Sequence, residues 1–281
     1  MVLNGFYRST STTLALGGLI FLAWITIVPF GFPGAPIAAS LLLILALAFM
    51  KLGSNSSPQL WETKTTPSQP PRVALMIAVA LGVQLAVGGL FQRFGSITLN
   101  ESILALAVWT LIPFAAVRLG FIHWPIRRAS PSRLELAAVA CAALAVAAML
   151  GALSTLNTGR EASFSTAILA RTSSVAALAA AEEIVFRVLL LTSLLQASRS
   201  RMSALIISSF VFGVGHAPLV LAQPIAAMDW PLLSEATKSY LPGLVWQVGV
   251  GFLLGALWLR TGSITLISAV HFILNVNLIF S

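Results

Sequence analysis

Two adjacent carboxylates and an arginine interrupt a long apolar stretch in the second half of the chain. Glu182 and Glu183 stand in AAEEIVFRVLL, residues 180–190, and Arg187 follows Glu183 by four positions. On a helix this spacing places Glu183 and Arg187 on one face, where they should pair, whereas Glu182 points about 100° away and remains available. Charges at membrane depth cost roughly 3 kcal/mol or more and normally face the interior of a helix bundle. The three residues therefore predict either a functional site or a structural, buried ion network.

Further polar residues lie in two later apolar segments. His216 follows Phe212 by four positions in FVFGVGHAPL, and Asn275 follows His271 by four positions in HFILNVNL. Counted from the expected cytoplasmic helix ends, Glu182, His216, His271 and Asn275 lie roughly 12 to 24 Å deep at about 1.5 Å per residue. We therefore expect these four side chains to line one polar cavity, and a carboxylate with two imidazoles suits acid–base chemistry there.

The composition indicates which elements carry these residues. The 281 residues are 58% hydrophobic and only 9% charged, and the mean hydropathy is +0.96. Since soluble domains have about 25% charged residues, the chain is predicted to be an all-α, polytopic transmembrane helix bundle of about eight or nine spans. Helices are predicted at 12–32, 36–50, 73–92, 102–122, 134–153, 166–198, 202–222, 241–260 and 263–280.

The predicted helices form two parts. Residues 1–133 would hold about four N-terminal spans and a polar loop at 51–72, and residues 134–281 would hold the core that contains the polar motifs. With nine spans, eleven of the 16 lysines and arginines fall on the N-terminal side and three on the other, while Arg171 and Arg187 lie within a span. Because basic residues favour the cytoplasm, the N-terminus is predicted to be cytoplasmic.

The basic residues also bear on partners. The formal net charge is +8, but these residues are scattered at the ends of apolar runs, so we expect membrane lipids and no nucleic acid as partners. The lone cysteine, Cys141, excludes an internal disulfide and is expected to be a small buried residue.

The order of the motifs resembles that of a known family. The set E-E-x-x-x-R, F-x-x-x-H and H-x-x-x-N on three late helices is similar to the CPBP family of intramembrane endopeptidases, also called the CAAX protease and bacteriocin-processing, or Abi, family. The stretch LRTGSI, residues 259–264, also looks like the family's turn before the last motif helix. The resemblance covers about residues 134–280.

The resemblance implies a role for each motif residue. Glu182 would act as the base that activates a water, and His216 would help to hold and polarise that water. His271 and Asn275 would donate to the oxyanion. Glu183, Arg187 and Phe212 would be structural residues that orient the motif helices. The substrate would be a membrane-associated or lipid-modified peptide or protein, and the location a bacterial inner or plasma membrane.

A metal-dependent mechanism is the main chemical alternative. Glu182, His216 and His271 could bind zinc with a water in an open position. However, H-E-x-x-H is missing and asparagine is a poor zinc ligand, so the metal-free glutamate mechanism is favoured, while zinc stays a possible cofactor.

Two functions of other classes stay open. The same fold could bind or sequester a peptide without cleaving it, as an immunity protein would. Buried Glu, Arg and His also mark the ion pathways of transporters, although we find no internal repeat of the kind on which many transporters are built.

Overall fold

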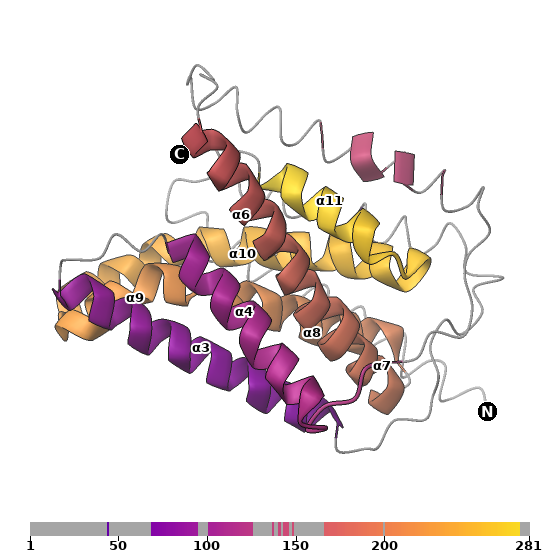
Figure 1. Ribbon diagram of the computed structural model, residues 1–281, viewed down its shortest axis with the longest axis horizontal. Coiled ribbons are helices and arrows are strands. Elements are labelled where there is room, and N and C mark those ends of the chain that lie inside the picture. The colour runs from indigo at the N-terminus through magenta and orange to yellow at the C-terminus, as the bar shows by residue number, and fades with distance from the viewer. Residues whose placement is uncertain are drawn as a thin grey trace.

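The computed structural model describes residues 69–94, 101–125, 166–198 and 200–275, together with isolated helical positions at 44 and between 137 and 148 (Figure 1). Every element of regular structure in these ranges is a helix, so the prediction of an all-α chain is confirmed for them. The helices predicted at 12–32 and 36–50, most of 134–153, and the end of 263–280 lie outside the described residues.

The first two described helices closely match their predicted ranges. Helix α3 covers Gln69–Phe94, where 73–92 was predicted, and α4 covers Glu101–Arg118, where 102–122 was predicted. The side-chain amide of Gln69 donates to the carbonyl oxygen of His123 at 2.7 Å, which ties the start of α3 to the segment after α4.

One long helical segment carries the EE motif and contains an unexpected irregularity. Helix α6 covers Thr166–Glu183, the π-helical segment η2 covers Ile184–Leu191, and α7 covers Thr192–Ser198. Together they correspond to the predicted helix 166–198. The Thr192 hydroxyl donates to the carbonyl oxygen of Arg187, five residues earlier, at 3.0 Å. Such π-segments are rare and frequently occur at functional sites.

The predicted helix 202–222 is wrong, because two helices replace it. Helix α8 covers Arg201–Gly215 and α9 covers Pro218–Ala227, and their axes differ by 53° across the break. Pro218 lacks the backbone N–H that would continue α8, and its fixed φ suits the first turn of a new helix. The break places His216 at the C-terminal cap of α8 instead of inside a helix.

The last two helices form a tight hairpin. Helix α10 covers Trp230–Thr261 and α11 covers Ile264–Leu274. Gly262 takes the left-handed conformation between them, with φ +56°, and the Ser263 hydroxyl accepts a hydrogen bond from the backbone N–H of Leu266. The turn predicted at LRTGSI is thus confirmed.

Helix α10 begins well before the predicted residue 241. The Asp229 carboxylate caps its start by accepting from the backbone N–H of Leu232 at 2.9 Å. At about 1.5 Å per residue, its 32 residues extend roughly 48 Å, more than a bilayer core of about 30 Å. The apolar pattern predicted only the part of α10 from residue 241 onward, because the exposed first turns contain Glu235 and Lys238.

The motif helices pack at the centre of the bundle. Helix α6 contacts both α4 and α11, and α8 packs along α10 (Figure 1). A Cβ atom on Gly251 of α10 would lie 2.9 Å from the Ser209 Cα atom of α8, so only glycine permits this close approach. The first described helix, α3, packs along α9.

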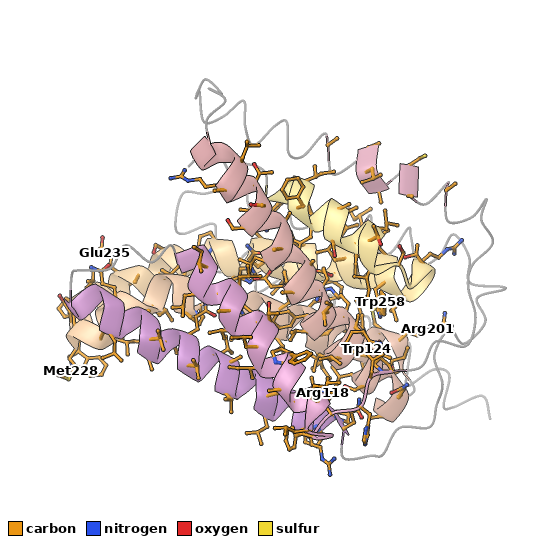
Figure 2. All side chains as sticks on the ribbon, viewed as in Figure 1. Arg118, Trp124, Arg201, Met228, Glu235 and Trp258 are labelled. Atoms are coloured by element: carbon orange, nitrogen blue, oxygen red, sulfur yellow. The ribbon has the colours of Figure 1, made fainter. Side chains whose placement is uncertain are left out.

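Length and composition make two of the described helices able to cross a membrane. They are the Gln69–Leu90 part of α3 and the whole of α10, and a bent pair made of α8 and α9 would be a third. The predicted count of eight or nine spans is therefore not reached within the described ranges. Arg118 and Arg201 lie toward one end of the molecule and Met228 and Glu235 at the other (Figure 2). Cys141 is exposed, so the expectation of a buried cysteine is wrong.

Candidate active site

Glu182 and two histidines from three different helices converge inside the bundle. The Oε2 atom of Glu182, near the end of α6, lies 3.6 Å from Nε2 of His271 on α11 and 3.8 Å from Nε2 of His216 at the end of α8. Both distances exceed the 2.7 to 3.2 Å of an ordinary hydrogen bond, and a single water could bridge such gaps. The Glu182 carboxylate and the Nε2 atoms of both predicted histidines therefore face one another.

Glu183 makes the ion pair that its spacing predicts. Its Oε2 atom lies 3.1 Å from Nε of Arg187, and both side chains are fully buried. The two terminal guanidinium nitrogens of Arg187 make no hydrogen bond with the described residues. Instead, the guanidinium carbon lies 4.4 Å from the centre of the Phe212 ring, a cation–π arrangement.

Glu183 also makes a contact that sequence reasoning missed. Its Oε1 atom lies 2.9 Å from Nδ1 of His271, whose side chain is fully buried. Because an ionised carboxylate can only accept, Nδ1 carries the hydrogen of this bond. Glu183 thus connects the motif helix to the last helix and orients the imidazole that faces Glu182.

The same reasoning assigns hydrogen-bond donor and acceptor roles to the ring nitrogens of both histidines. Nδ1 of His216 lies 2.9 Å from the carbonyl oxygen of Phe212, which can only accept, so this nitrogen also carries a hydrogen. In the neutral ring Nε2 is therefore an acceptor directed toward Glu182. Nε2 of His271 has no hydrogen-bond partner among the described residues, and it can donate only if that ring is an imidazolium ion.

Phe212 forms the apolar wall against which these groups pack. Its ring centroid lies 4.8 Å from that of His216 and 5.6 Å from that of His271, both in edge-on arrangements. Phe212 itself is fully buried. The F-x-x-x-H spacing thus puts the phenylalanine against both imidazoles, one on its own helix and one on α11.

The comparison with known proteins agrees with this geometry. Residues 162–277 match the family described as Type II CAAX prenyl endopeptidase Rce1-like. This segment is therefore similar to the Rce1-like, or CPBP, family. No curated protein and no solved structure matches the chain.

The Rce1-like segment contains all the described helices from α6 to α11 and so the whole polar cluster, whereas α3 and α4 precede it. It falls within the predicted core 134–281, whose boundary with the N-terminal part stays a prediction. The family and the apolar helices together indicate an integral membrane protein.

Asn275 is the predicted site residue with the least described surroundings. It follows α11 as its C-terminal cap, one turn beyond His271, and its backbone N–H donates to the carbonyl oxygens of His271 and Phe272 at 3.1 Å each. These are contacts of its backbone. That the side-chain amide joins the polar cluster stays a prediction.

The predicted zinc alternative concerns Glu182, His216 and His271. Within the described ranges, no group of three or more His, Cys, Asp or Glu side chains is arranged so that it could hold a metal ion. Their cluster consists of a carboxylate and two imidazoles, which are acceptable zinc ligands in chemical type. Metal dependence is therefore a question for experiment.

Proposed function

We propose that the protein is an intramembrane endopeptidase that hydrolyses a peptide bond of a membrane-associated or lipid-modified peptide or protein. The observation that carries the proposal is the position of Glu182 Oε2, within 3.6 and 3.8 Å of two imidazole nitrogens in a segment similar to the Rce1-like family. That family's description, a CAAX prenyl endopeptidase, favours a prenylated C-terminal peptide as the substrate class to test first.

In this mechanism Glu182 is the general base. A water between Glu182 and Nε2 of His216 would donate one hydrogen bond to each, because both groups are acceptors. The water oxygen attacks the carbonyl carbon of the peptide bond while its proton passes to Glu182. The same proton then moves from Glu182 to the departing amine nitrogen, which breaks the C–N bond and regenerates the carboxylate.

The oxyanion that forms needs hydrogen-bond donors. His271 can supply one from Nε2 as an imidazolium ion, because Glu183 already holds its Nδ1 hydrogen. With that proton, the buried group of Glu182, Glu183, Arg187 and His271 has two negative and two positive charges. The side-chain amide of Asn275, one turn away, is the proposed second donor.

The test compares Glu182→Gln with the wild-type protein in detergent or lipid vesicles. Glutamine keeps the volume of the side chain and removes its basicity, so the variant should fold and bind peptide but lose at least about 100-fold in cleavage rate. A prenylated peptide and its unprenylated counterpart, both with a free C-terminus, serve as substrates, and mass spectrometry identifies the product.

Each result assigns one mechanism. Cleavage by Glu182→Gln at the wild-type rate would remove Glu182 as the base. Activity that a chelator abolishes and zinc restores would favour the metal mechanism instead. Peptide binding without cleavage by the wild-type protein would favour the non-catalytic peptide-binding function.

A further inference from the structure

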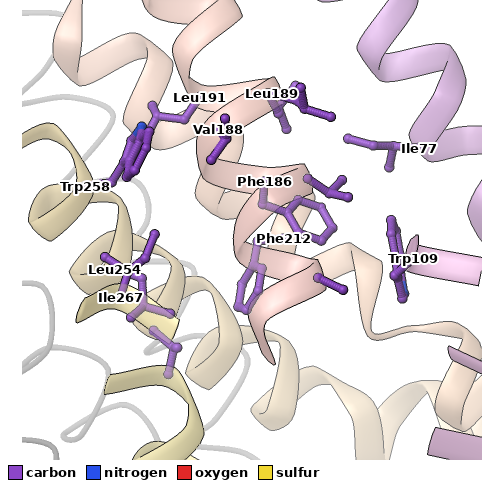
Figure 3. Close-up of a cluster of buried hydrophobic side chains, with 14 of the residues drawn as sticks. Ile77, Trp109, Phe186, Val188, Leu189, Leu191, Phe212, Leu254, Trp258 and Ile267 are labelled. Carbon is purple, nitrogen blue, oxygen red and sulfur yellow. The ribbon is translucent and has the colours of Figure 1, made fainter. Parts of the chain in front are cut away.

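A residue outside the Rce1-like segment packs against the core of the proposed site. Trp109 lies on α4, more than fifty positions before residue 162, where the family match begins. Its side chain is 3% exposed, and its ring centroid lies 5.2 Å from that of Phe186 on η2, at an interplanar angle of 51° (Figure 3). The N-terminal part of the chain thus reaches the motif helix.

The contact continues from Phe186 to the histidines. Phe186 packs edge-on against Phe212 at 5.2 Å between centroids, and the Phe212 ring is the one that touches both His216 and His271. Trp109, Phe186 and Phe212 therefore form a continuous row of three buried rings, which we call the aromatic row. It runs from α4 to the two imidazoles that face Glu182.

Phe186 contacts both α8 and α4. A Cβ atom on Gly215, directly before His216, would lie 3.0 Å from Cζ of Phe186, so this ring already touches the backbone of α8. The Trp109 indole contacts the same ring from α4. Because protein interiors are close-packed and transmit displacements, loss of the indole would allow Phe186 to move away from Phe212 and from the end of α8.

We propose that Trp109 is a positioning residue of the active site. Through Phe186 and Phe212 it holds the His216 and His271 rings at the separations from Glu182 that admit one water. This inference rests on the proposed peptidase function. A misplacement of about 1 Å can cost roughly 100-fold in rate, so a residue on α4 can control turnover without touching the reacting atoms.

The experiment must separate positioning from general packing. Trp109→Ala removes the indole, and Trp109→Phe restores a flat ring. Met76→Ala, on α3, is the matched control, because Met76 is also 3% exposed but is not part of the aromatic row. Phe114→Ala controls for a lost aromatic ring on α4 itself, since Phe114 is 64% exposed.

All variants are assayed well below their melting temperatures, and kcat and KM are measured separately. We expect Trp109→Ala to lower kcat roughly 10- to 100-fold, because the aromatic row touches the histidines. We expect KM to change less than about threefold, because the buried row does not contact the substrate itself. Trp109→Phe should recover most of kcat. Met76→Ala and Phe114→Ala should keep the wild-type kcat, even where Met76→Ala lowers the melting temperature.

Other outcomes contradict the inference. A folded Trp109→Ala with the kcat of Met76→Ala would show that Trp109 is ordinary packing. If Trp109→Ala does not accumulate, Trp109→Leu keeps apolar bulk without the flat ring, and a wild-type kcat in that variant overturns the proposal. A wild-type protein without Glu182-dependent cleavage contradicts the proposed function, whereas a Glu182-dependent enzyme that is indifferent to Trp109 contradicts this inference alone.

Discussion

Oε1 of Glu183 accepts the Nδ1 hydrogen of His271 at 2.9 Å, although the two residues are 88 positions apart in the sequence. The same carboxylate pairs through Oε2 with Arg187. One buried side chain thus fixes both the motif helix and the orientation of the imidazole that faces Glu182. This arrangement makes Glu183 more than the partner of Arg187, because it also decides which ring nitrogen of His271 is directed into the site.

Replacing Glu183 should therefore impair turnover through His271. Glu183→Gln keeps the shape, but its amide can present either oxygen or nitrogen to Nδ1, so the ring loses its fixed tautomer. We expect cleavage to fall roughly 100- to 10,000-fold, the range from lost positioning to a wrong tautomer. The nitrogen-15 spectrum of labelled histidine gives an independent measurement, because the chain has only three histidines. An unchanged His271 tautomer together with reduced activity would show that the loss has another cause.

Removing Arg187 should mainly lower the stability of the protein, with a smaller effect on the rate of catalysis. Arg187→Ala leaves the Glu183 carboxylate buried without its cation, which costs roughly 3 to 5 kcal/mol for a well-buried pair. Thermal melting and expression level measure the effect. Arg171→Ala is the control, since Arg171 is exposed on the same helical segment. Adding Glu183→Gln to Arg187→Ala should recover part of the stability; no recovery would mean that the cost comes from the lost contact with Phe212.

The Glu183–Arg187 pair could be predicted from sequence because a spacing of four residues determines it within one helix. The hydrogen bond from His271 to Glu183 could not, because it depends on how α11 is rotated against α6. Depth along each helix predicted the meeting of Glu182, His216 and His271, since a bundle holds its spans side by side. The break before Pro218 was missed because the residues on both sides are equally apolar, although the proline itself indicates that a helix can end there.

The π-helical segment was also missed, because a single extra residue in a turn leaves the apolar pattern nearly unchanged. Hydrogen bonds of Thr192, the first residue after this segment, connect it to α10. The Thr192 hydroxyl donates to the Arg187 carbonyl, and it accepts from Nε1–H of Trp258 on α10 at 3.1 Å. This hydroxyl therefore links the turn after Arg187 to the longest helix of the bundle.

Thr192→Val tests the importance of this link. Valine keeps the branched shape but removes the acceptor of this hydrogen bond, so we expect a loss of about 1 to 3 kcal/mol in the free energy of unfolding. Combining it with Trp258→Phe, which removes the donor of the same hydrogen bond, should cost less than the sum of the two single changes. Melting curves of the four proteins give this comparison. Strict additivity would mean that Thr192 and Trp258 act independently.

Topology is the remaining prediction about the whole chain. Eleven of the 16 basic residues fall on one side of the nine-span arrangement and three on the other, and Arg118 and Arg201 of the larger group lie toward the same end of the molecule (Figure 2). Because lysine and arginine favour the cytoplasmic side, a reporter fused at residue 62 should be cytoplasmic and one fused after residue 281 should be on the opposite side. A reporter inserted near Glu235, at the other end of the molecule, provides the internal control and should agree with the second fusion. Finding the fusions at 62 and 281 on one side would contradict an odd number of spans between them.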